Sequence, residues 1–143
     1  MSLIFSTAER DEKIIAILKN TKTIALLGAS NKPERASYKV MAFLIARGYQ
    51  VFPVNPMLAG QQLLGREVYA SLHDIPEPID MLDVFRQSQY LVDIVVEANK
   101  AKVKFIWAQL GVMDSKAELF AKENGMVMIV DSCPAIEVPR LGL

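Results

Sequence analysis

Small residues that could hold a phosphate group follow the first apolar segment of the chain. Gly28, Ala29 and Ser30 come directly after the run Thr23–Leu27. Glycine lets the backbone turn sharply, and small side chains let main-chain N–H groups approach an anion at the start of a helix. The full G-x-G-x-x-G pattern is absent, so a tight turn that holds no ligand stays open as the alternative.

Basic side chains continue this segment. Lys32, Arg35 and Lys39 stand at short spacing after the small residues. Their charges suit contacts to phosphate oxygens. For the three basic side chains, a solvated surface face is the other interpretation that the sequence leaves open.

The end of the second apolar segment carries no carboxylate. An NAD-binding domain usually places an acidic residue there, about 20 residues past the glycines, to hold the ribose hydroxyl groups. This chain has Val54, Asn55 and Pro56 at that place. With the basic side chains of the first loop, this pattern favours a ligand that carries an extra phosphate group. Both coenzyme A (CoA) and NADP fit that description.

Two further loops follow apolar segments and could complete such a site. Phe85 and Arg86 come after the third segment, and Gln109, Leu110 and Gly111 come after the fourth. We expect Arg86 on the ligand side of the sheet, the alternative being an exposed residue that caps the next helix. Gly111 would let the backbone lie close to a flat ring or a pantetheine chain, or it serves a simple strand-to-helix turn.

These residues need a scaffold, and five short apolar segments alternate with helical patterns along the chain. Capping boxes at Ser6–Glu9 and Ser115–Glu118 mark two helix starts, and Gly48 and Gly125 mark two helix ends. The expected helices cover Ser6–Asn20, a segment from Val40 to Gly48, Ser88–Ala101 and a segment from Ser115 to Asn124, and the expected strands are Thr23–Leu27, Tyr49–Val54, Met81–Phe85, Phe105–Ala108 and Met126–Val130.

This alternation predicts an α/β fold: a Rossmann-like, doubly wound, parallel five-stranded sheet with helices on both faces. We expect residues 1–143 to form a single domain, in which 1–20 are an N-terminal helix and 134–143 an ordered tail. The stretch Pro56–Asp80 is irregular, and we expect a short extra strand or turn of helix around Glu67–Leu72. In such sheets a ligand lies beyond the carboxyl ends of the strands, which is where the loops above are found.

The composition narrows the class of partner. Sixteen basic and sixteen acidic residues cancel, so the overall charge attracts neither nucleic acid nor an anionic membrane. No apolar run reaches the length of about 20 residues that crosses a bilayer, and the N-terminus lacks the pattern of a signal peptide. We expect a cytoplasmic protein. A homo-oligomer formed by edge strands stays open.

Groups that could do catalysis or bind metal are scarce. His73 is the single histidine and lies in the irregular stretch, where we expect an exposed surface residue. Cys133 is the single cysteine, so no internal disulfide forms. Neither residue has neighbours at metal-ligand spacing, and we expect no structural metal and a reducing compartment.

The chain resembles the CoA-binding protein family, whose domain also occurs in the α subunit of succinyl-CoA synthetase. The matching pieces are IALLGASNKPERASYKVMAFL, GYQVFPVNP, DMLDVFR, WAQLGV and VDSCPAIEVPRLGL, in order along nearly the whole chain. The resemblance implies a stand-alone CoA-binding domain. It places Gly28, Ala29 and Ser30 at phosphate, Val54, Asn55 and Pro56 at the nucleotide half, and Phe85, Arg86, Gln109, Leu110 and Gly111 at the rest of the ligand, with Arg35, Ser37 and Lys39 as additional phosphate contacts.

One departure from the family lies next to the cysteine. Family members often carry a basic residue before the Cys-Pro pair, whereas this chain has Ser132. If that residue helps to bind phosphate, CoA affinity is reduced here or the ligand is changed. Cys133 is either a buried, inert thiol or a partner of the CoA thiol in a mixed disulfide.

The sequence is compatible with three functions. The first is non-catalytic binding of CoA or an acyl-CoA; the synthetase's phosphorylated histidine and ligase domain lie outside the shared part. The second is an NADP-dependent oxidoreductase, for which the sequence offers no convincing residue to assist hydride transfer. The third is a protein-interaction module that uses the same groove.

Overall fold

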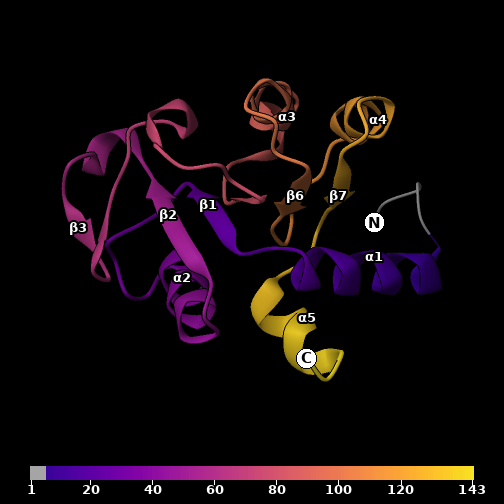
Figure 1. The fold of residues 1–143 in the computed structure, drawn as a ribbon, viewed down its shortest axis with the longest axis horizontal. Coiled ribbons are helices and arrows are strands. Elements are labelled where there is room, and N and C mark those ends of the chain that lie inside the picture. Colours follow the sequence, from indigo (N-terminus) through magenta and orange to yellow (C-terminus); the bar gives the residue numbers. More distant parts are fainter. Residues whose placement is uncertain (1–5) are drawn as a thin grey trace.

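A computed structural model describes residues 6–143 of the protein, and in this part the helices and strands alternate (Figure 1). The α-helices are α1 (Thr7–Lys19), α2 (Ala36–Ala46), α3 (Leu91–Lys100), α4 (Ser115–Glu123) and α5 (Pro134–Arg140). The strands are β1 (Thr23–Leu27), β2 (Gln50–Val54), β3 (Gln62–Leu63), β4 (Arg66–Glu67), β5 (Met81–Val84), β6 (Phe105–Ala108) and β7 (Val127–Ile129), and the 3₁₀ turns are η1 (Pro56–Leu58), η2 (Leu72–Asp74) and η3 (Ser88–Tyr90).

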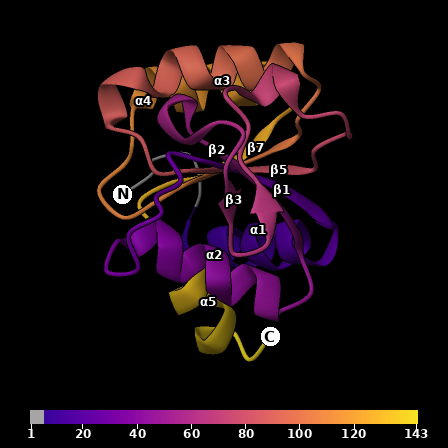
Figure 2. The same ribbon diagram turned by 90° about the vertical axis from the view of Figure 1, so that its left-hand side faces the viewer.

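Five parallel strands form the central sheet of the described residues, in the order β2-β1-β5-β6-β7. Helices α3 and α4 cover one face, and α1, α2 and α5 cover the other (Figure 2). The expected doubly wound, Rossmann-like α/β fold is thereby confirmed. The strand order reverses between β1 and β5, because the chain moves outward to β2 first and then returns to the other side of β1. That reversal opens a crevice at the carboxyl ends of β1 and β5.

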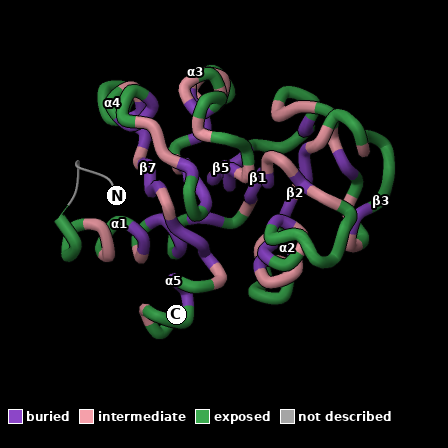
Figure 3. Tube along the Cα trace, turned by 180° about the vertical axis from the view of Figure 1, so that it is seen from behind, coloured by how far each residue is buried: buried purple, intermediate pink, exposed green. Residues whose placement is uncertain are grey.

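Apolar strand residues fill both sides of the sheet. One core cluster lies under α3 and α4 and the other under α1, α2 and α5, so most of the trace of the central strands is coloured as buried in Figure 3. The second cluster surrounds Trp107, which is fully buried. Short continuous apolar runs suit such strands, because neither of their faces meets water.

Asp83 is the exception among these buried strand residues. It lies in β5 between Leu26 of β1 and Trp107 of β6, is 0% exposed, and its carboxyl oxygens have no hydrogen-bond partner among residues 6–143. Burial raises the pKa of Asp83 well above its ordinary value, because a charge in this core has nothing to compensate its lost hydration.

Local signals in the sequence located most helix ends. The Ser6 hydroxyl accepts a hydrogen bond from the Glu9 N–H, and Gly48 follows α2 with φ +93°. The capping box expected at Ser115 was wrong, because the carboxylate of Asp114 caps α4 by accepting from the N–H groups of Lys116 and Ala117. An acidic side chain one residue earlier makes the better N-cap, since it also meets the positive end of the helix dipole.

The two segments without a clear period turn out to be ordered in different ways. The tail expected from residue 134 packs on the domain as helix α5, which begins with Pro134 and continues through Pro139. The stretch Pro56–Asp80 holds two 3₁₀ turns and the two-stranded antiparallel hairpin β3–β4. The extra structure expected around Glu67–Leu72 is therefore the end of β4 and the start of η2. No helix among residues 6–143 is both long and apolar enough to span a membrane.

Candidate functional site

Two clefts lie at the carboxyl ends of β1, β2 and β5. The larger one, called here the large cleft, has a volume of about 620 Å³, and the neighbouring small cleft has about 390 Å³. The large cleft is lined by the apolar residues Leu27, Gly28, Val54, Pro56, Met57, Ala70, Leu72, Leu82 and Ile94 and by Asn55, Ser71, His73, Arg86, Tyr90, Asp93 and Glu97. The small cleft is lined by Gly28, Ala29, Ser30, Asn31, Lys32, Arg35, Ala36, Ser37, Asn55, Met57, Leu58 and Phe85.

Gly28 sets how closely the loop after β1 approaches β5. Its φ is +90°, and a Cβ atom added there would lie 2.9 Å from the carbonyl oxygen of Phe85. Both observations exclude a larger residue, because the backbone conformation favours glycine and the contact is with rigid main chain. The crevice at the strand-order reversal depends on this close approach.

The main-chain N–H groups of Gly28 and Ala29 are already used within the protein. Both donate to the carbonyl oxygen of Val54, at 3.1 and 3.2 Å. The sequence led us to expect these amides to face an anion. In the structure they instead tie the loop after β1 to the end of β2, so donors for an anion have to come from farther along the loop.

The start of α2 supplies such donors. Arg35 is the N-cap residue of α2, yet no side chain in the described part of the chain caps the helix, and its first turn carries no acidic residue. The uncapped N–H groups and the helix dipole favour an anion at this end. Ser37 is buried in the wall of the small cleft, whereas Lys32 and Arg35 are exposed at its rim. The small cleft therefore suits a phosphate group.

Asn55 joins the loops after β1 and β2. Its Nδ2 donates to the carbonyl oxygen of Ala29 at 2.7 Å, and its Oδ1 accepts from the N–H of Met57 at 2.8 Å. Its own main-chain N–H donates to the carbonyl oxygen of Tyr69 at 2.9 Å. The residue that stands where an NAD-binding domain usually has an acid thus fixes the boundary between the two clefts.

Polar side chains from η2, from the segment after β5 and from α3 close the outer wall of the large cleft. Nε2 of His73 lies 2.6 Å from Oε2 of Glu97, and this hydrogen bond, followed by that from Lys100, holds the pKa of Glu97 below its ordinary value. The guanidinium carbon of Arg86 lies 4.8 Å from the centre of the Tyr90 ring. The cleft thus has an apolar interior, which suits an uncharged part of a ligand, and a polar rim.

The structure brings together most of the residues that the sequence singled out. Gly28, Ala29, Ser30, Arg35, Ser37, Val54, Asn55, Pro56, Phe85 and Arg86 all line one or both clefts. Lys39, Gln109, Leu110 and Gly111 line neither. His73 is exposed, as expected, but it also lines the large cleft.

The loop Gln109–Gly111 is instead held by hydrogen bonds to other loops of the protein. The Gly111 N–H donates to Oδ1 of Asp131 at 2.8 Å, its carbonyl oxygen accepts from the Ser88 hydroxyl at 3.2 Å, and Gln109 is only 5% exposed. These contacts orient the loop toward neighbouring loops of the protein.

Sequence reasoning missed one wall of the large cleft: Met57, Ala70, Ser71, Leu72, Tyr90, Asp93, Ile94 and Glu97. Half of these residues lie in the irregular stretch after β2. This stretch has no helical or strand periodicity, so its position at the sheet edge could not be predicted from the sequence. The position of α3 beyond the predicted strand β5 was the signal that could have located the others.

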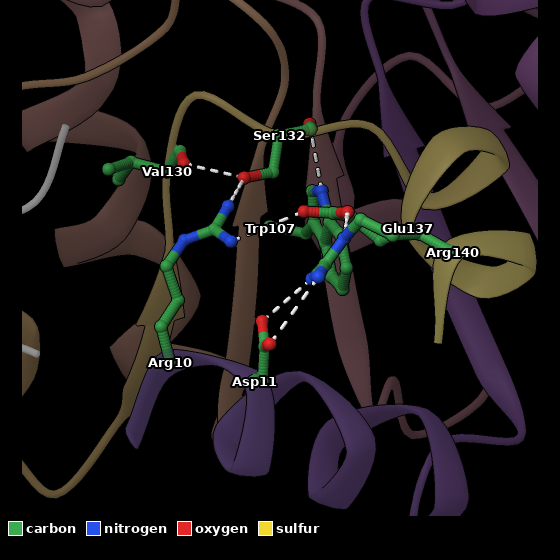
Figure 4. Close-up of polar contacts among 7 residues, drawn as sticks. All are labelled: Arg10, Asp11, Trp107, Val130, Ser132, Glu137 and Arg140. Atoms are coloured by element: carbon green, nitrogen blue, oxygen red, sulfur yellow. Dashed lines mark hydrogen bonds and ion pairs between the residues drawn. The ribbon is translucent and has the colours of Figure 1, made fainter. Parts of the chain in front are cut away.

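The end of β7 is filled by a network of polar side chains (Figure 4). The Ser132 hydroxyl accepts a hydrogen bond from Arg10 and donates to the carbonyl oxygen of Val130 at 2.8 Å. Trp107 Nε1 donates to the Ser132 carbonyl oxygen at 2.9 Å. A basic side chain therefore does lie next to the Cys-Pro pair, but it comes from α1 rather than from position 132.

Glu137 joins this network to both terminal helices. It pairs with Arg10 at 3.2 Å and with Arg140 at 2.6 Å, and Arg140 also pairs with Asp11 at 2.6 Å. Cys133 lies beside them at 7% exposure, within the core cluster, and lines neither cleft. Among residues 6–143 there is no group of three or more metal-ligating side chains that could hold an ion.

Comparisons with known proteins identify the family of this chain. The sequence pattern of the CoA binding domain family matches residues 22–139, which contain both clefts. The chain belongs to this family. The resemblance inferred from the five sequence pieces is thereby confirmed.

The relatives of this CoA binding domain include small proteins of similar length and parts of larger enzymes. The chain is 36% identical over 121 residues to the uncharacterized protein YneT of Bacillus subtilis, with 85% of this chain and 88% of that protein covered. A solved structure from Thermus thermophilus has a TM-score of 0.86 and 40% identity, with 92% of this chain and 98% of that chain covered. The α subunit of the ADP-forming acetate–CoA ligase I of Pyrococcus furiosus is 32% identical over 93 residues, which are 62% of this chain and 20% of that subunit.

Proposed function

We propose that the protein binds CoA, or an acyl-CoA, without catalysing a reaction on it. The ligand spans both clefts, with phosphate groups in the small cleft and an uncharged part in the large one. The observation that carries this proposal is the uncapped start of α2, flanked by Lys32 and Arg35, directly beside a large apolar cleft. A ligand with several phosphates and a long uncharged arm uses both features.

The proposed contacts follow the lining of the clefts. Ser30, Lys32, Arg35 and Ser37 contact phosphate, together with the N–H groups at the start of α2. Val54, Asn55, Pro56, Phe85 and Arg86 contact the rest of the ligand, and Gly28 keeps the crevice open. We leave Lys39, Gln109, Leu110 and Gly111 out of the proposed site, because they line neither cleft.

Two observations support a binding role without catalysis. Cys133 is buried away from both clefts, so the thiol of a bound CoA does not meet it in this conformation. His73 lines the large cleft, but one of its ring nitrogens is engaged by Glu97, and no serine, threonine or cysteine side chain bonds to the histidine among the described residues. A hydrogen-bonded nucleophile and base, which covalent catalysis usually requires, is therefore lacking there.

Thermal unfolding with different ligands tests the proposal. The protein is unfolded alone and with CoA, acetyl-CoA, NAD or NADP. We expect CoA and acetyl-CoA to raise the Tm, since a ligand at about 100 times its Kd adds about 2.7 kcal/mol to the stability of the folded state. A shift with NADP alone would support a dehydrogenase instead. No shift with any of the four would contradict binding of these cofactors.

A second measurement addresses catalysis. Acetyl-CoA is incubated with the protein at equal concentration, and the thioester absorbance and the free thiol are followed over hours. We expect both to match a protein-free control. Loss of the thioester with the wild type but not with the His73→Gln variant would overturn the non-catalytic part of the proposal and identify His73 as the reacting group.

A further inference from the structure

Met57 stands where the two clefts meet. It is the central residue of the turn η1 and, at 86% exposure, the most exposed large apolar side chain in residues 6–143. Of the residues that the structure describes, only Gly28, Asn55 and Met57 line both clefts. A ligand that spans the clefts has to pass these three residues.

Elimination leaves Met57 as the side chain that can respond to such a ligand. Gly28 has none. The amide group of Asn55 is engaged on both sides, because Nδ2 donates to Ala29 and Oδ1 accepts from the N–H of Met57. The thioether of Met57 keeps most of its surface in solvent, and this surface is apolar and polarizable.

The backbone below this side chain is held in place. The Met57 N–H donates to Asn55 Oδ1 at 2.8 Å, and the Leu58 N–H donates to the Asn55 carbonyl oxygen at 3.1 Å. Pro56 fixes φ at the start of the turn. Met57 is therefore presented from a restrained turn, and only its own rotatable bonds need to be fixed when a ligand covers it.

We infer that Met57 is a specificity-determining residue that selects one ligand occupying both clefts over separate ligands that occupy one cleft each. This inference rests on the proposed CoA function. An unbranched thioether adapts to a flat ring or to an alkyl chain. The ligand class it favours has an anionic part in the small cleft and an apolar part in the large cleft, joined over Met57.

Binding of CoA and of its two halves tests the role of Met57. Calorimetry measures the Kd values of CoA, adenosine 3′,5′-bisphosphate and 4′-phosphopantetheine for the wild type and for Met57→Ala, Met57→Leu and Leu119→Ala. Leu119 is the matched control, because it is 53% exposed on α4 and lines neither cleft.

We expect Met57→Ala to weaken CoA binding by about three- to tenfold, which corresponds to one or two methylene-sized groups of Met57 being covered by the ligand. The loss for either half should be smaller than for CoA. Met57→Leu should stay within about twofold of the wild type because its volume is similar, and Leu119→Ala should not differ. The unliganded Tm should stay the same in all variants, because these side chains are exposed.

A methyl NMR spectrum supplies a direct readout. The protein has seven methionines, and comparison with Met57→Leu assigns the Met57 signal, which should shift when CoA is added. Unchanged CoA affinity in Met57→Ala, or an equal loss for CoA and for one of its halves, would overturn the inference while the proposed function stands. If the wild type binds no CoA, the proposed function fails and the inference fails with it.

Discussion

The carboxyl edge of the sheet has an open half, where clefts lie at the strand ends, and a closed half, where polar side chains of the protein cover them. Above β2, β1 and β5 the loops leave two clefts, and the side chains of Lys32 and Arg35 pair with no group among residues 6–143. Above β7, the protein's own side chains fill the edge, and Arg10 and Arg140 both pair with Glu137. The same kind of strand end is thus left open for a ligand in one half and closed in the other.

The two halves should therefore respond differently when charged side chains are replaced. In the open half, the side chains of Lys32 and Arg35 have no partner among residues 6–143, so replacing these cations should alter ligand binding and leave folding unaffected. In the closed half, α1 and α5 supply the partners, so substitutions should alter stability and leave binding unaffected.

Gly28→Ala should lower both the stability of the protein and its affinity for CoA. The added Cβ meets the Phe85 carbonyl oxygen at 2.9 Å in a backbone with φ +90°, so we expect a loss of at least about 2 kcal/mol in unfolding free energy and no measurable CoA binding. Gly125→Ala is the control, since its φ is +73° but nothing lies within 4 Å of the new atom. It should cost about 1 kcal/mol and leave binding unchanged. Equal losses of stability in denaturant titrations of the two variants would contradict the close approach at Gly28.

Glu137→Gln should affect stability alone. The carboxylate is 10% exposed and pairs with two guanidinium groups, so its replacement leaves both with weaker hydrogen bonds and should cost about 1–3 kcal/mol. Urea unfolding measures this loss. The affinity of the variant for CoA, measured well below its Tm, should match the wild type. A weaker CoA affinity would show that the closed half takes part in binding.

Replacing the cations of the open half should weaken CoA binding and leave stability unchanged. Lys32→Gln combined with Arg35→Gln should weaken CoA binding by about tenfold or more, because charge-assisted hydrogen bonds to phosphate are lost. The unfolding free energy should change by less than about 0.5 kcal/mol, as for other surface substitutions. Lys116→Gln combined with Lys122→Gln removes the same charge from α4 and should change neither. Equal weakening by both pairs would mean that overall charge, rather than the small cleft, attracts the ligand.

The smallest effect is a pH dependence in the closed half. The hydrogen bond from Arg140 lowers the pKa of Asp11 from its ordinary 3.8. A depressed folded-state pKa means that the pair's contribution to stability is present above 3.8 and is lost as the pH falls through the lower folded value. NMR titration of the Asp11 carboxyl should show this pKa rising toward 3.8 in Arg140→Gln. An unchanged Asp11 pKa in that variant would remove Arg140 as the cause.

The sequence predicted the open half better than the closed one, for a physical reason. Strand β1 and Gly28 produce local signals, an apolar run and a turn residue, and the loops at parallel strand ends then follow from the topology. The contact of Arg10 with Ser132 joins residues more than a hundred positions apart, and no local pattern encodes it. The wall formed by His73 and Glu97 was missed for the same reason, since η2 reaches α3 through an irregular stretch.

The separation of the two halves is tested most directly by mapping CoA onto the protein with amide NMR. We expect the signals of residues lining the two clefts to shift as CoA is added, above all those of Ser30, Lys32, Arg35 and Ser37, and the signals of Ser132, Cys133 and Glu137 to stay unchanged. Shifts centred on Ser132, Cys133 and Glu137, or no shifts at saturating CoA, would contradict the separation of the two halves.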